Sequence, residues 1–296
     1  MGRGRRASKK FRMKLSIIIP TIGRPTLEKV LQGIERCDGY DEIQPEVIVV
    51  FNSDASDTNV GFLKFESEVD TTHFKVFRSE KHGVSTARNL GMDKSTGEII
   101  AFLGDDTIPE KEWLRKVRDF HVRFPSQKIA LLGRISWVRE LGADPFHQWL
   151  QNHAQFDFEN IQKRGATWQH FYTSNVSVKR SLIISERFDE DFVGWGFEDT
   201  ELAYRLSKRG MKIIYDSECE VFHDHPQTLA SIVANTKNAR HNAERFEALH
   251  PELSILPRGM KLLALRGVIW VLEFLIPLKP DLAWWTAWKR AWIGDF

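Results

Sequence analysis

The chain has 296 residues, of which 42% are hydrophobic and 28% are charged, and its formal net charge is +2. These values are typical of a globular protein of one large or two small domains with a full hydrophobic core. Its two cysteines, Cys37 and Cys219, exclude a disulfide framework and favour a reducing, cytosolic location.

Residues 1–14 form a basic leader with seven lysine or arginine residues and no acidic residue. Such a run is typical of a flexible tail, and it can also contact anionic lipid or nucleic acid. It lacks the apolar stretch of a signal peptide. No recognised nucleic-acid-binding module accompanies the leader, so we expect no nucleic-acid partner.

The first half of the chain alternates predicted strands with predicted helices. Residues 15–20 (LSIIIP) and 46–51 (EVIVVF) are continuous apolar runs, which are typical of strands buried on both faces of a parallel sheet. Further strands are predicted over 74–78 and 98–103, and helices over 85–94 and 26–34, the latter with Thr26 as a candidate cap. This alternation predicts an open α/β sheet.

Polar residues follow the predicted strands of this half. Thr21 follows the first strand, Asn52 opens a polar turn over 52–57 after the second, and Asp105 and Asp106 follow the fourth. Ligands of open α/β sheets bind beyond the carboxyl ends of the strands. We therefore expect these residues to lie along one edge of the sheet.

The second half is less regular. Residues 113–171 are rich in aromatic residues and histidine, and we interpret them as a helix, a strand over 129–138 and a mobile, substrate-facing segment. Short strands are then predicted over 173–178, 212–215 and 220–223, with a helix over 200–209 that ends at Gly210, a residue favoured at helix C-termini.

Residues 251–296 form an apolar, tryptophan-rich tail. Its apolar stretch over 261–278 is slightly short for a membrane span and contains Arg266 and Glu273, which are costly in a bilayer. We interpret the tail as an interfacial helix pair, with its later tryptophans at headgroup depth. The alternative is a helical extension packed on the domain or on a partner chain. The tryptophans of this pair are Trp284, Trp285, Trp288 and Trp292.

A Gly-Trp-Gly turn at 194–196 runs directly into acidic residues that open a predicted helix. The glycines allow a tight bend, Trp195 offers a flat apolar platform, and a helix N-terminus favours ionised carboxylates. This arrangement suits a general base beside a sugar acceptor. The alternative is an ordinary helix N-terminus with a buried tryptophan.

Two further clusters suit a divalent cation. Asp105 and Asp106 offer hard oxygen ligands at a strand end, and His223 with His225 offers imidazoles after another short strand. One carboxylate, one histidine and two phosphate oxygens would form a plausible site. The alternatives are a polar turn with two exposed acids and a surface histidine pair.

Taken together, these segments resemble the family 2 glycosyltransferases of the GT-A fold over about residues 15–226. The resemblance rests on four motifs in order: SIIIPT, VIVVFNSDASDT, GVSTARNLGMDKSTGEIIAFLGDD, and GWGFEDTELAYRLSKRG with VFHDH. The GWGFED segment also looks like the acceptor-side module of galactosyltransferase-type enzymes. The resemblance implies a mixed, mainly parallel sheet flanked by helices over 15–250, with a C-terminal helical extension. Residues 15–106 would be the nucleotide-sugar half and 107–250 the acceptor half.

The resemblance also implies roles for particular residues on the donor side. Asp106 would be the main ligand of Mn²⁺ or Mg²⁺, with His223 as the second ligand and His225 as the fallback. Gly104 stands where many members have the first acid of the metal-binding triad, which predicts fewer protein ligands around the metal. The nucleotide-sugar would be bound by Thr21 near the base or ribose, Asn52 at the base, Arg88 near the diphosphate, and Asp105 and Asp106.

On the acceptor side, Asp199 would be the general base, Glu198 would bind acceptor hydroxyls as a second catalytic residue, and Trp195 would stack on the sugar.

The base of the donor nucleotide is less defined. Phe51 and Asn52 replace a usual acidic pair, so uridine is favoured because asparagine can hydrogen-bond it, while guanine and thymine nucleotides remain open.

The sequence therefore predicts a metal-dependent, inverting glycosyltransferase that moves a sugar from a nucleotide-sugar to a glycan or lipid-linked acceptor. It would be cytoplasmic, with possible peripheral contact of the tail on the cytoplasmic face of a membrane. Two alternatives stay open. A nucleotidyltransferase would need a glycine-rich, lysine-bearing loop, which residues 21–25 do not supply convincingly, and a non-catalytic carbohydrate-binding protein would not need Asp106, Asp199 and His223.

Overall fold

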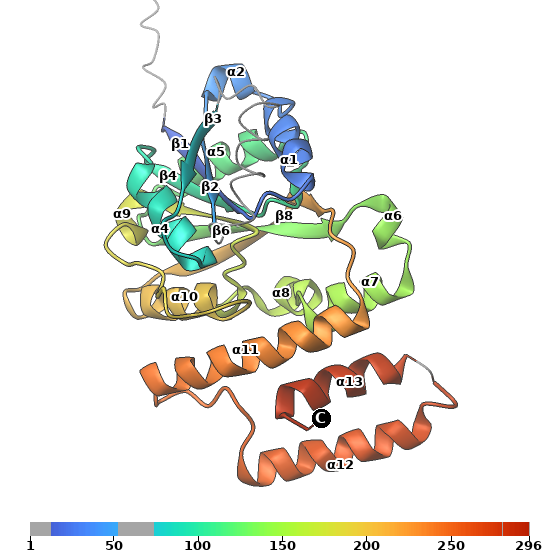
Figure 1. Cartoon of the computed structure of the whole chain (residues 1–296). Coiled ribbons are helices and arrows are strands. Elements are labelled where there is room, and N and C mark those ends of the chain that lie inside the picture. The colour runs from blue at the N-terminus through green and yellow to red at the C-terminus, as the bar shows by residue number, and fades with distance from the viewer. Residues whose placement is uncertain (1–12, 53–73, 280, 296) are drawn as a thin grey trace, which may run out of the picture.

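The computed structural model describes residues 13–52, 74–279 and 281–295. Most of the expected leader (residues 1–12) and residues 53–57 of the polar turn lie outside the described residues. Within those ranges the chain forms a mixed sheet flanked by helices, with three further helices layered on one side (Figure 1). This architecture confirms the α/β class expected from the alternating pattern.

The strands of the sheet are β1 (Leu15–Thr21), β2 (Glu46–Phe51), β3 (Phe74–Arg78), β4 (Ile99–Leu103), β5 (Thr107–Pro109), β6 (Ile129–Trp137), β7 (Asn175–Lys179) and β8 (Lys212–His223). Their spatial order is β3-β2-β1-β4-β7-β6-β8-β5. The first four in this order are parallel to one another, β6 is parallel to β8, and the other neighbours are antiparallel.

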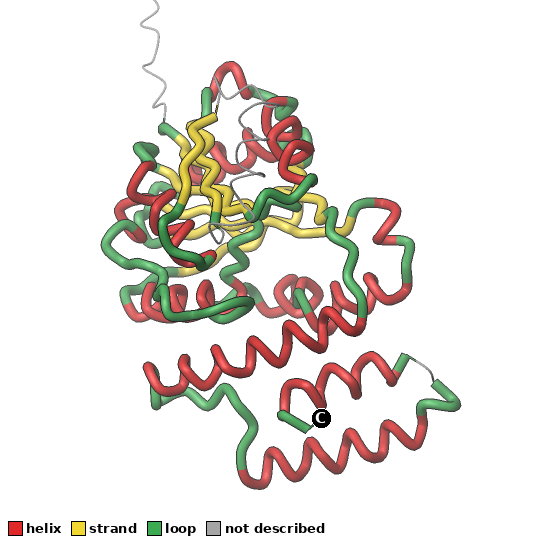
Figure 2. The backbone as a smooth tube through the Cα atoms, in the orientation of Figure 1, coloured by secondary structure: helices red, strands yellow, loops and turns green. Residues whose placement is uncertain are grey.

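The longer helices are α1 (Thr26–Glu35), α4 (Val84–Lys94), α5 (Trp113–Arg123), α10 (Glu198–Lys208), α11 (Leu229–Leu249), α12 (Gly259–Leu275) and α13 (Leu282–Ile293). Short helices occupy the connections, and Figure 2 shows how they alternate with loops around the sheet. They are α2 (Tyr40–Ile43), α6 (Arg139–Gly142), α7 (Pro145–Trp149), η1 (Leu150–Ala154), α8 (Phe158–Arg164), η2 (Trp168–His170) and α9 (Arg180–Ile183).

Both faces of the parallel half of the sheet are covered, as its apolar runs predicted. Along β2, Val47 and Val49 join the main core, whereas Ile48 and Val50 pack with Ala87 of α4 on the opposite face. Side chains alternate between the two faces of a strand. A strand that must bury both faces therefore has no polar alternation in its sequence.

Two local expectations are wrong. Thr26 does not cap α1, because the helix begins at Thr26 itself and the hydroxyl of Thr26 donates to the backbone oxygen of Asp105 at 2.9 Å. The two short strands expected at 212–215 and 220–223 are one continuous strand, β8. The register of its pairing with β6 shifts between Gly133 and Arg134, and this shift accommodates the polar residues of β8 that lie between its two apolar stretches.

The C-terminal tail forms the expected helix pair, α12 and α13. Figure 1 shows α11, α13 and α12 layered in that order away from the sheet, so α13 lies between the other two helices. Within the described part of the chain, no helix is both long and apolar enough to cross a membrane. The contacts of α13 with both α11 and α12 layer the pair onto α11.

Candidate active site

A cavity of about 550 Å³ opens where the carboxyl ends of the strands face α10, α11 and α13. Most of the residues expected to act in the reaction line it, from both halves of the domain. They are Arg88, Asp105, Asp106, Trp195, Glu198, Asp199, His223 and His225. Thr21 and Asn52 are buried and do not line this cavity.

The acidic turn after β4 is held by residues of the loop that follows β1. The hydroxyl of Thr21 donates to Asp105 Oδ2 at 2.7 Å. One guanidinium nitrogen of Arg24 lies 3.1 Å from Asp105 Oδ1 and 2.7 Å from Asp106 Oδ2. Thr21 therefore orients Asp105 from beneath the cavity. Arg24, which the sequence analysis did not single out, is the cation that balances both acids.

Gly104 leaves room for this arrangement. A Cβ added at Gly104 would lie 2.8 Å from Asp106 Oδ1, closer than side chains normally approach. The backbone nitrogen of Gly104 donates to the hydroxyl of Thr107 at 2.9 Å, which closes the turn. A side chain at this position, where the resemblance implies an acid in many members, would therefore require the carboxylate of Asp106 to move.

Strand pairing brings His223 to Asp106. Strands β5 and β8 are antiparallel, with Thr107 opposite His223, and the backbone nitrogen of Asp224 donates to the backbone oxygen of Asp106 at 2.8 Å. His223 Nε2 then lies 3.4 Å from Asp106 Oδ2. Trp137 of β6 stacks on the imidazole with ring centroids 4.7 Å apart, which fixes its orientation.

The charges around Asp106 determine its protonation. Burial opposes ionisation, but the hydrogen bond and charge of His223, with the charge of Arg24, outweigh it and hold the pKa of Asp106 below its usual value. Burial raises the pKa of Asp105 instead, and the neighbouring charge of Asp106 adds to this effect. The pKa of Asp106 is therefore lowered and that of Asp105 is raised, which makes Asp106 the more acidic of the two.

The pair Asp106 and His223 fits one divalent cation. Two adjacent ligands of an octahedral ion with bonds of about 2.1 Å lie about 3.0 Å apart, close to the 3.4 Å between His223 Nε2 and Asp106 Oδ2. His225 is the nearest further imidazole, with its ring centroid 6.2 Å from that of His223. Among the described residues no group of three or more His, Cys, Asp or Glu side chains gathers around one point, so further ligands would have to come from substrate or water.

Elsewhere in the lining of the same cavity, the Gly-Trp-Gly turn positions the start of α10. Gly194, Gly196 and Phe197 all have positive φ (78°, 94° and 75°), the left-handed conformation that glycine adopts without strain. Asn242 of α11 donates its amide to the backbone oxygens of Gly196 at 2.9 Å and Val193 at 3.1 Å. Asn242 is a second residue that the sequence analysis missed, because nothing local marks it. Trp195 is 44% exposed, and it lines the cavity.

Glu198 and Asp199 stand at the first turn of α10 in different environments. Glu198 is buried and forms an ion pair of 2.8 Å with Arg88 NH1. Asp199 accepts hydrogen bonds from the backbone nitrogen of Thr200 at 2.7 Å and from the hydroxyl of Thr173 at 3.4 Å. Burial, and next the charge of Glu198, raise the pKa of Asp199 to about 6, against the opposing effect of Arg88. Asp199 is therefore more basic than an ordinary aspartate.

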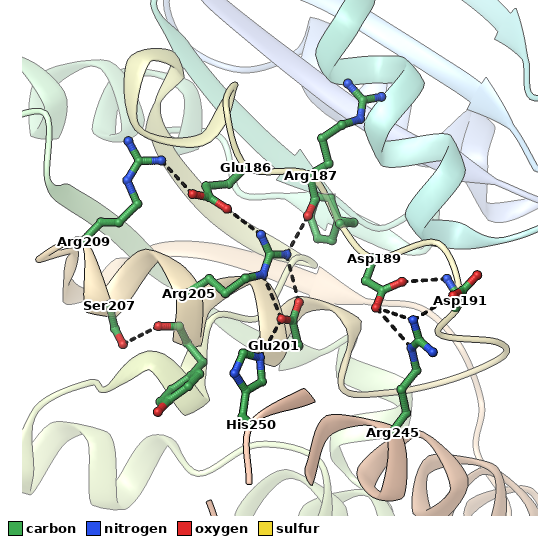
Figure 3. Close-up of polar contacts among 12 residues, drawn as sticks. Glu186, Arg187, Asp189, Asp191, Glu201, Arg205, Ser207, Arg209, Arg245 and His250 are labelled. Carbon is green, nitrogen blue, oxygen red and sulfur yellow. Dashed lines mark hydrogen bonds and ion pairs between the residues drawn. The ribbon is translucent and has the colours of Figure 1, made fainter. Parts of the chain in front are cut away.

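A network of ion pairs holds α10 from behind (Figure 3). Arg205 contacts Glu201 through Nε at 2.8 Å and Glu186 through NH1 at 2.6 Å. His250, at the end of α11, contacts the same Glu201 at 2.9 Å. Arg245 of α11 binds Asp189 at 2.7 Å. Both ends of the segment 186–205 are thus fastened to α11, which fixes the helix that carries Asp199.

The third wall of the cavity comes from the tail. Trp288, Lys289 and Trp292 of α13 line it. Trp288 lies edge-on to Trp149, and Trp292 stacks on Phe197 with ring centroids 5.9 Å apart. Trp284, Trp288 and Trp292 are partly buried against aromatic partners on the domain. The expectation that the tryptophans of the tail lie at headgroup depth stays a prediction. The tryptophan-rich pattern of the sequence indicated that these rings pack on some apolar surface, but it did not indicate which surface.

The segment expected to be substrate-facing, 139–171, forms several short helices and supplies Gln155 and Phe156 to the cavity lining. Asn52 Oδ1 accepts from the backbone nitrogen of Gly83 at 2.6 Å, which couples the end of β2 to the start of α4. The expected base and ribose contacts of Asn52 and Thr21 stay predictions.

Comparison with known families and proteins gives concordant results. A model of glycosyl transferase family 2 matches residues 16–185. A validoxylamine A glucosyltransferase of Streptomyces hygroscopicus subsp. limoneus is 27% identical over 289 residues, covering 88% of this chain and 61% of the relative. A GalNAc(5)-diNAcBac-PP-undecaprenol beta-1,3-glucosyltransferase of Campylobacter jejuni is 32% identical over 188 residues, covering 61% and 56%. The chain thus spans less than two thirds of the length of these relatives.

Solved structures show the same fold. The mannosyltransferase PcManGT of Pyrobaculum calidifontis, in complex with GDP-Man and Mn²⁺, superposes with a TM-score of 0.63 at 16% identity, covering 97% of this chain and 86% of that one. TarS 1-349 of S. aureus, in complex with UDP-GlcNAc, gives 0.52 at 15% identity, covering 96% and 93%. The expected GT-A architecture is confirmed.

Proposed function

The chain belongs to glycosyl transferase family 2, and on that premise we propose that it transfers a sugar from a nucleotide-sugar to a hydroxyl of a glycan or lipid-linked acceptor, with inversion and with Mn²⁺ or Mg²⁺. One observation carries the proposal. Asp106, His223 and Asp199 all line a single cavity, which would receive both a donor and an acceptor.

Asp106 and His223 would hold the cation, which would supply positive charge for the leaving nucleoside diphosphate. Thr21 and Arg24 orient the acidic turn beside it. Trp137 holds the imidazole of His223 in place. These contacts exist without substrate, so the donor side is organised in advance, as electrostatic stabilisation of a leaving group requires.

Asp199 accepts the proton of the acceptor hydroxyl. Its pKa of about 6 leaves it ionised at neutral pH, yet more basic than an ordinary aspartate. Thr173 and Thr200 orient its oxygens, and Trp195 offers the acceptor sugar an apolar face. The hydroxyl attacks the anomeric carbon from the face opposite the diphosphate, and one displacement of this type inverts the configuration. Glu198 is held by Arg88, so it contacts the acceptor through its remaining oxygen, Oε2.

The names of the relatives support this substrate class. They include glucosyltransferases, one of them named for an undecaprenol-linked acceptor, and the structural neighbours hold GDP-Man or UDP-GlcNAc. We favour uridine for this chain. Because the structural neighbours hold a guanosine or a uridine nucleotide-sugar, the test includes donors with either base.

We also propose that the tail brings the enzyme to a membrane surface on the cytoplasmic side. The outer stripe of α12 exposes large apolar side chains, with no acidic residue on the stripe. They are Met260, Leu263, Trp270, Val271, Phe274 and, just beyond the helix, Leu278. This stripe, rather than the tryptophans of α13, would contact lipid.

The test is a screen of UDP-, GDP- and dTDP-sugars for released nucleoside diphosphate, with Mn²⁺ or Mg²⁺ and with a panel of glycan acceptors. Turnover of one donor with an acceptor, and a product of inverted anomeric configuration by NMR, is the expected result. Release of pyrophosphate from a nucleoside triphosphate would favour a nucleotidyltransferase instead. Sugar binding without any donor turnover would favour a carbohydrate-binding protein.

A further inference from the structure

Lys289 of α13 differs from the other cations of the cavity. Among the described residues, three lysine or arginine side chains line it: Arg24, Arg88 and Lys289. Arg24 is paired with Asp105 and Asp106, and Arg88 is paired with Glu198. Lys289 forms no ion pair within the described part of the chain. Burial alone lowers its pKa, with no carboxylate to oppose it.

The ammonium of Lys289 rests on an aromatic surface. Its Nζ lies 3.7 Å from the ring centroid of Trp288 and 5.7 Å from that of Trp285. The face of a tryptophan ring attracts a cation and covers part of its charge. A ring cannot accept the three hydrogen bonds that an ammonium can donate. The remaining donors therefore suit a ligand in the cavity.

The helix that carries Lys289 is held in position. Arg290 pairs with Glu273 of α12 at 2.5 Å, and Arg266 of α12 pairs with Asp295 at 2.5 Å. Arg240 of α11 donates to the backbone oxygen of Trp292 at 2.7 Å, at the C-terminus of α13. These contacts fix the helix whose Lys289 lines the cavity. The position also lies outside residues 16–185, so membership of the family does not imply it.

We propose that Lys289 binds a phosphate of the donor's diphosphate, and so adds a positive charge beside the leaving group in the cavity that it shares with Asp106. This inference rests on the proposed function, because that function supplies a diphosphate. Of the groups that would enter the cavity, the diphosphate carries the greatest negative charge, and a lysine ammonium binds phosphate as a point charge. The two other lining cations already serve carboxylates.

Calorimetric binding of UDP, GDP and inorganic pyrophosphate tests the inference, in EDTA and again with Mn²⁺. Lys289→Met keeps the side-chain stem on Trp288 but removes the charge, and it should weaken all three ligands by about tenfold or more. Lys289→Arg should stay within about threefold of the parent. Lys261→Met, an exposed lysine of α12, is the matched control and should bind like the parent.

Equal binding of pyrophosphate by the parent and Lys289→Met would overturn the inference while leaving the proposed function intact. If the parent bound none of the three ligands, the proposed function itself would fail, and the inference with it. Lys289→Gln is measured in parallel, and far-UV circular dichroism of each variant separates a lost phosphate contact from misfolding. A loss confined to UDP and GDP, with pyrophosphate unchanged, would also contradict a phosphate contact.

Discussion

His223 Nε2 lies 3.4 Å from Oδ2 of Asp106, although the two residues stand in different halves of the sequence. The antiparallel pairing of β5 with β8 produces this proximity, since Thr107 lies opposite His223. A carboxylate and an imidazole at this spacing can share one cation with little movement. Strand register therefore brings together the two residues that we propose to act on the donor side of the cavity.

Removing either member of this pair should weaken metal-dependent donor binding. Asp106→Ala and His223→Gln should each reduce the affinity for UDP in Mn²⁺ by about tenfold or more, because each removes one of two protein ligands. In EDTA the effect of His223→Gln should largely disappear. Calorimetry with and without Mn²⁺ measures both cases. His241→Gln, an exposed histidine of α11, is the control, and an equal loss in that variant would contradict the assignment.

Asp199→Asn should lower kcat by about 10²- to 10⁴-fold, because an amide cannot accept the acceptor proton. Donor binding should stay within about twofold of the parent, since Asp199 is not among the residues proposed to bind the donor or the metal. Steady-state kinetics and UDP calorimetry on the same preparation give both values. Asp119→Asn, on the exposed face of α5, is the matched control. A variant that kept most of its kcat would show that another group takes the proton.

The pH dependence should follow Asp199. Its pKa is raised to about 6, and the base acts only when ionised. The value of kcat/KM should therefore be level near neutral pH and fall as the pH decreases through 6, approaching tenfold per pH unit well below it. Initial rates between pH 5 and pH 8 measure this limb. A profile that stays flat down to pH 5 would mean that Asp199 is not the titrating base.

Asn242→Ala should separate stability from chemistry. Loss of its amide leaves the backbone oxygens of Gly196 and Val193 without this donor, which should cost about 1–3 kcal/mol in the free energy of unfolding. The looser turn should raise the KM for the acceptor through Trp195, with donor affinity unchanged. Urea unfolding and acceptor kinetics are the measurements. Asn160→Ala, an exposed asparagine of α8, should change neither quantity.

The outer stripe of α12 should mediate vesicle binding. The parent should co-float with vesicles that contain anionic lipid, and Trp270→Ser with Phe274→Ser should reduce the bound fraction several-fold, because these side chains are 71% and 80% exposed. Val122→Ser, exposed on α5, serves as control. If the parent stayed unbound, or if the double variant only dissociated a dimer in sedimentation analysis, the membrane proposal would be wrong.

Much of the cavity was predictable because local patterns encode it. Continuous apolar runs identified β1, β2 and β4, and the polar residues after them marked the sheet edge where Asp105 and Asp106 lie. Arg24 was not predictable, because a basic residue in a loop has no signal for the acids that it pairs with in space. Asn242 lies in the middle of α11 and contacts a turn distant in sequence, so no local pattern could indicate it.

The sequence by itself determined most of the strands and several of the helices that carry the proposed site residues, because apolar periodicity and short motifs are local properties. Only the tertiary structure decided that Asp106 meets His223 and that Glu198 is held by Arg88. It also decided that Trp288, Lys289 and Trp292 of α13 line the cavity. Those relationships depend on the register of the paired strands and on which exposed aromatic side chains of the sheet domain α13 can pack against. Both are settled by the packing of the whole chain.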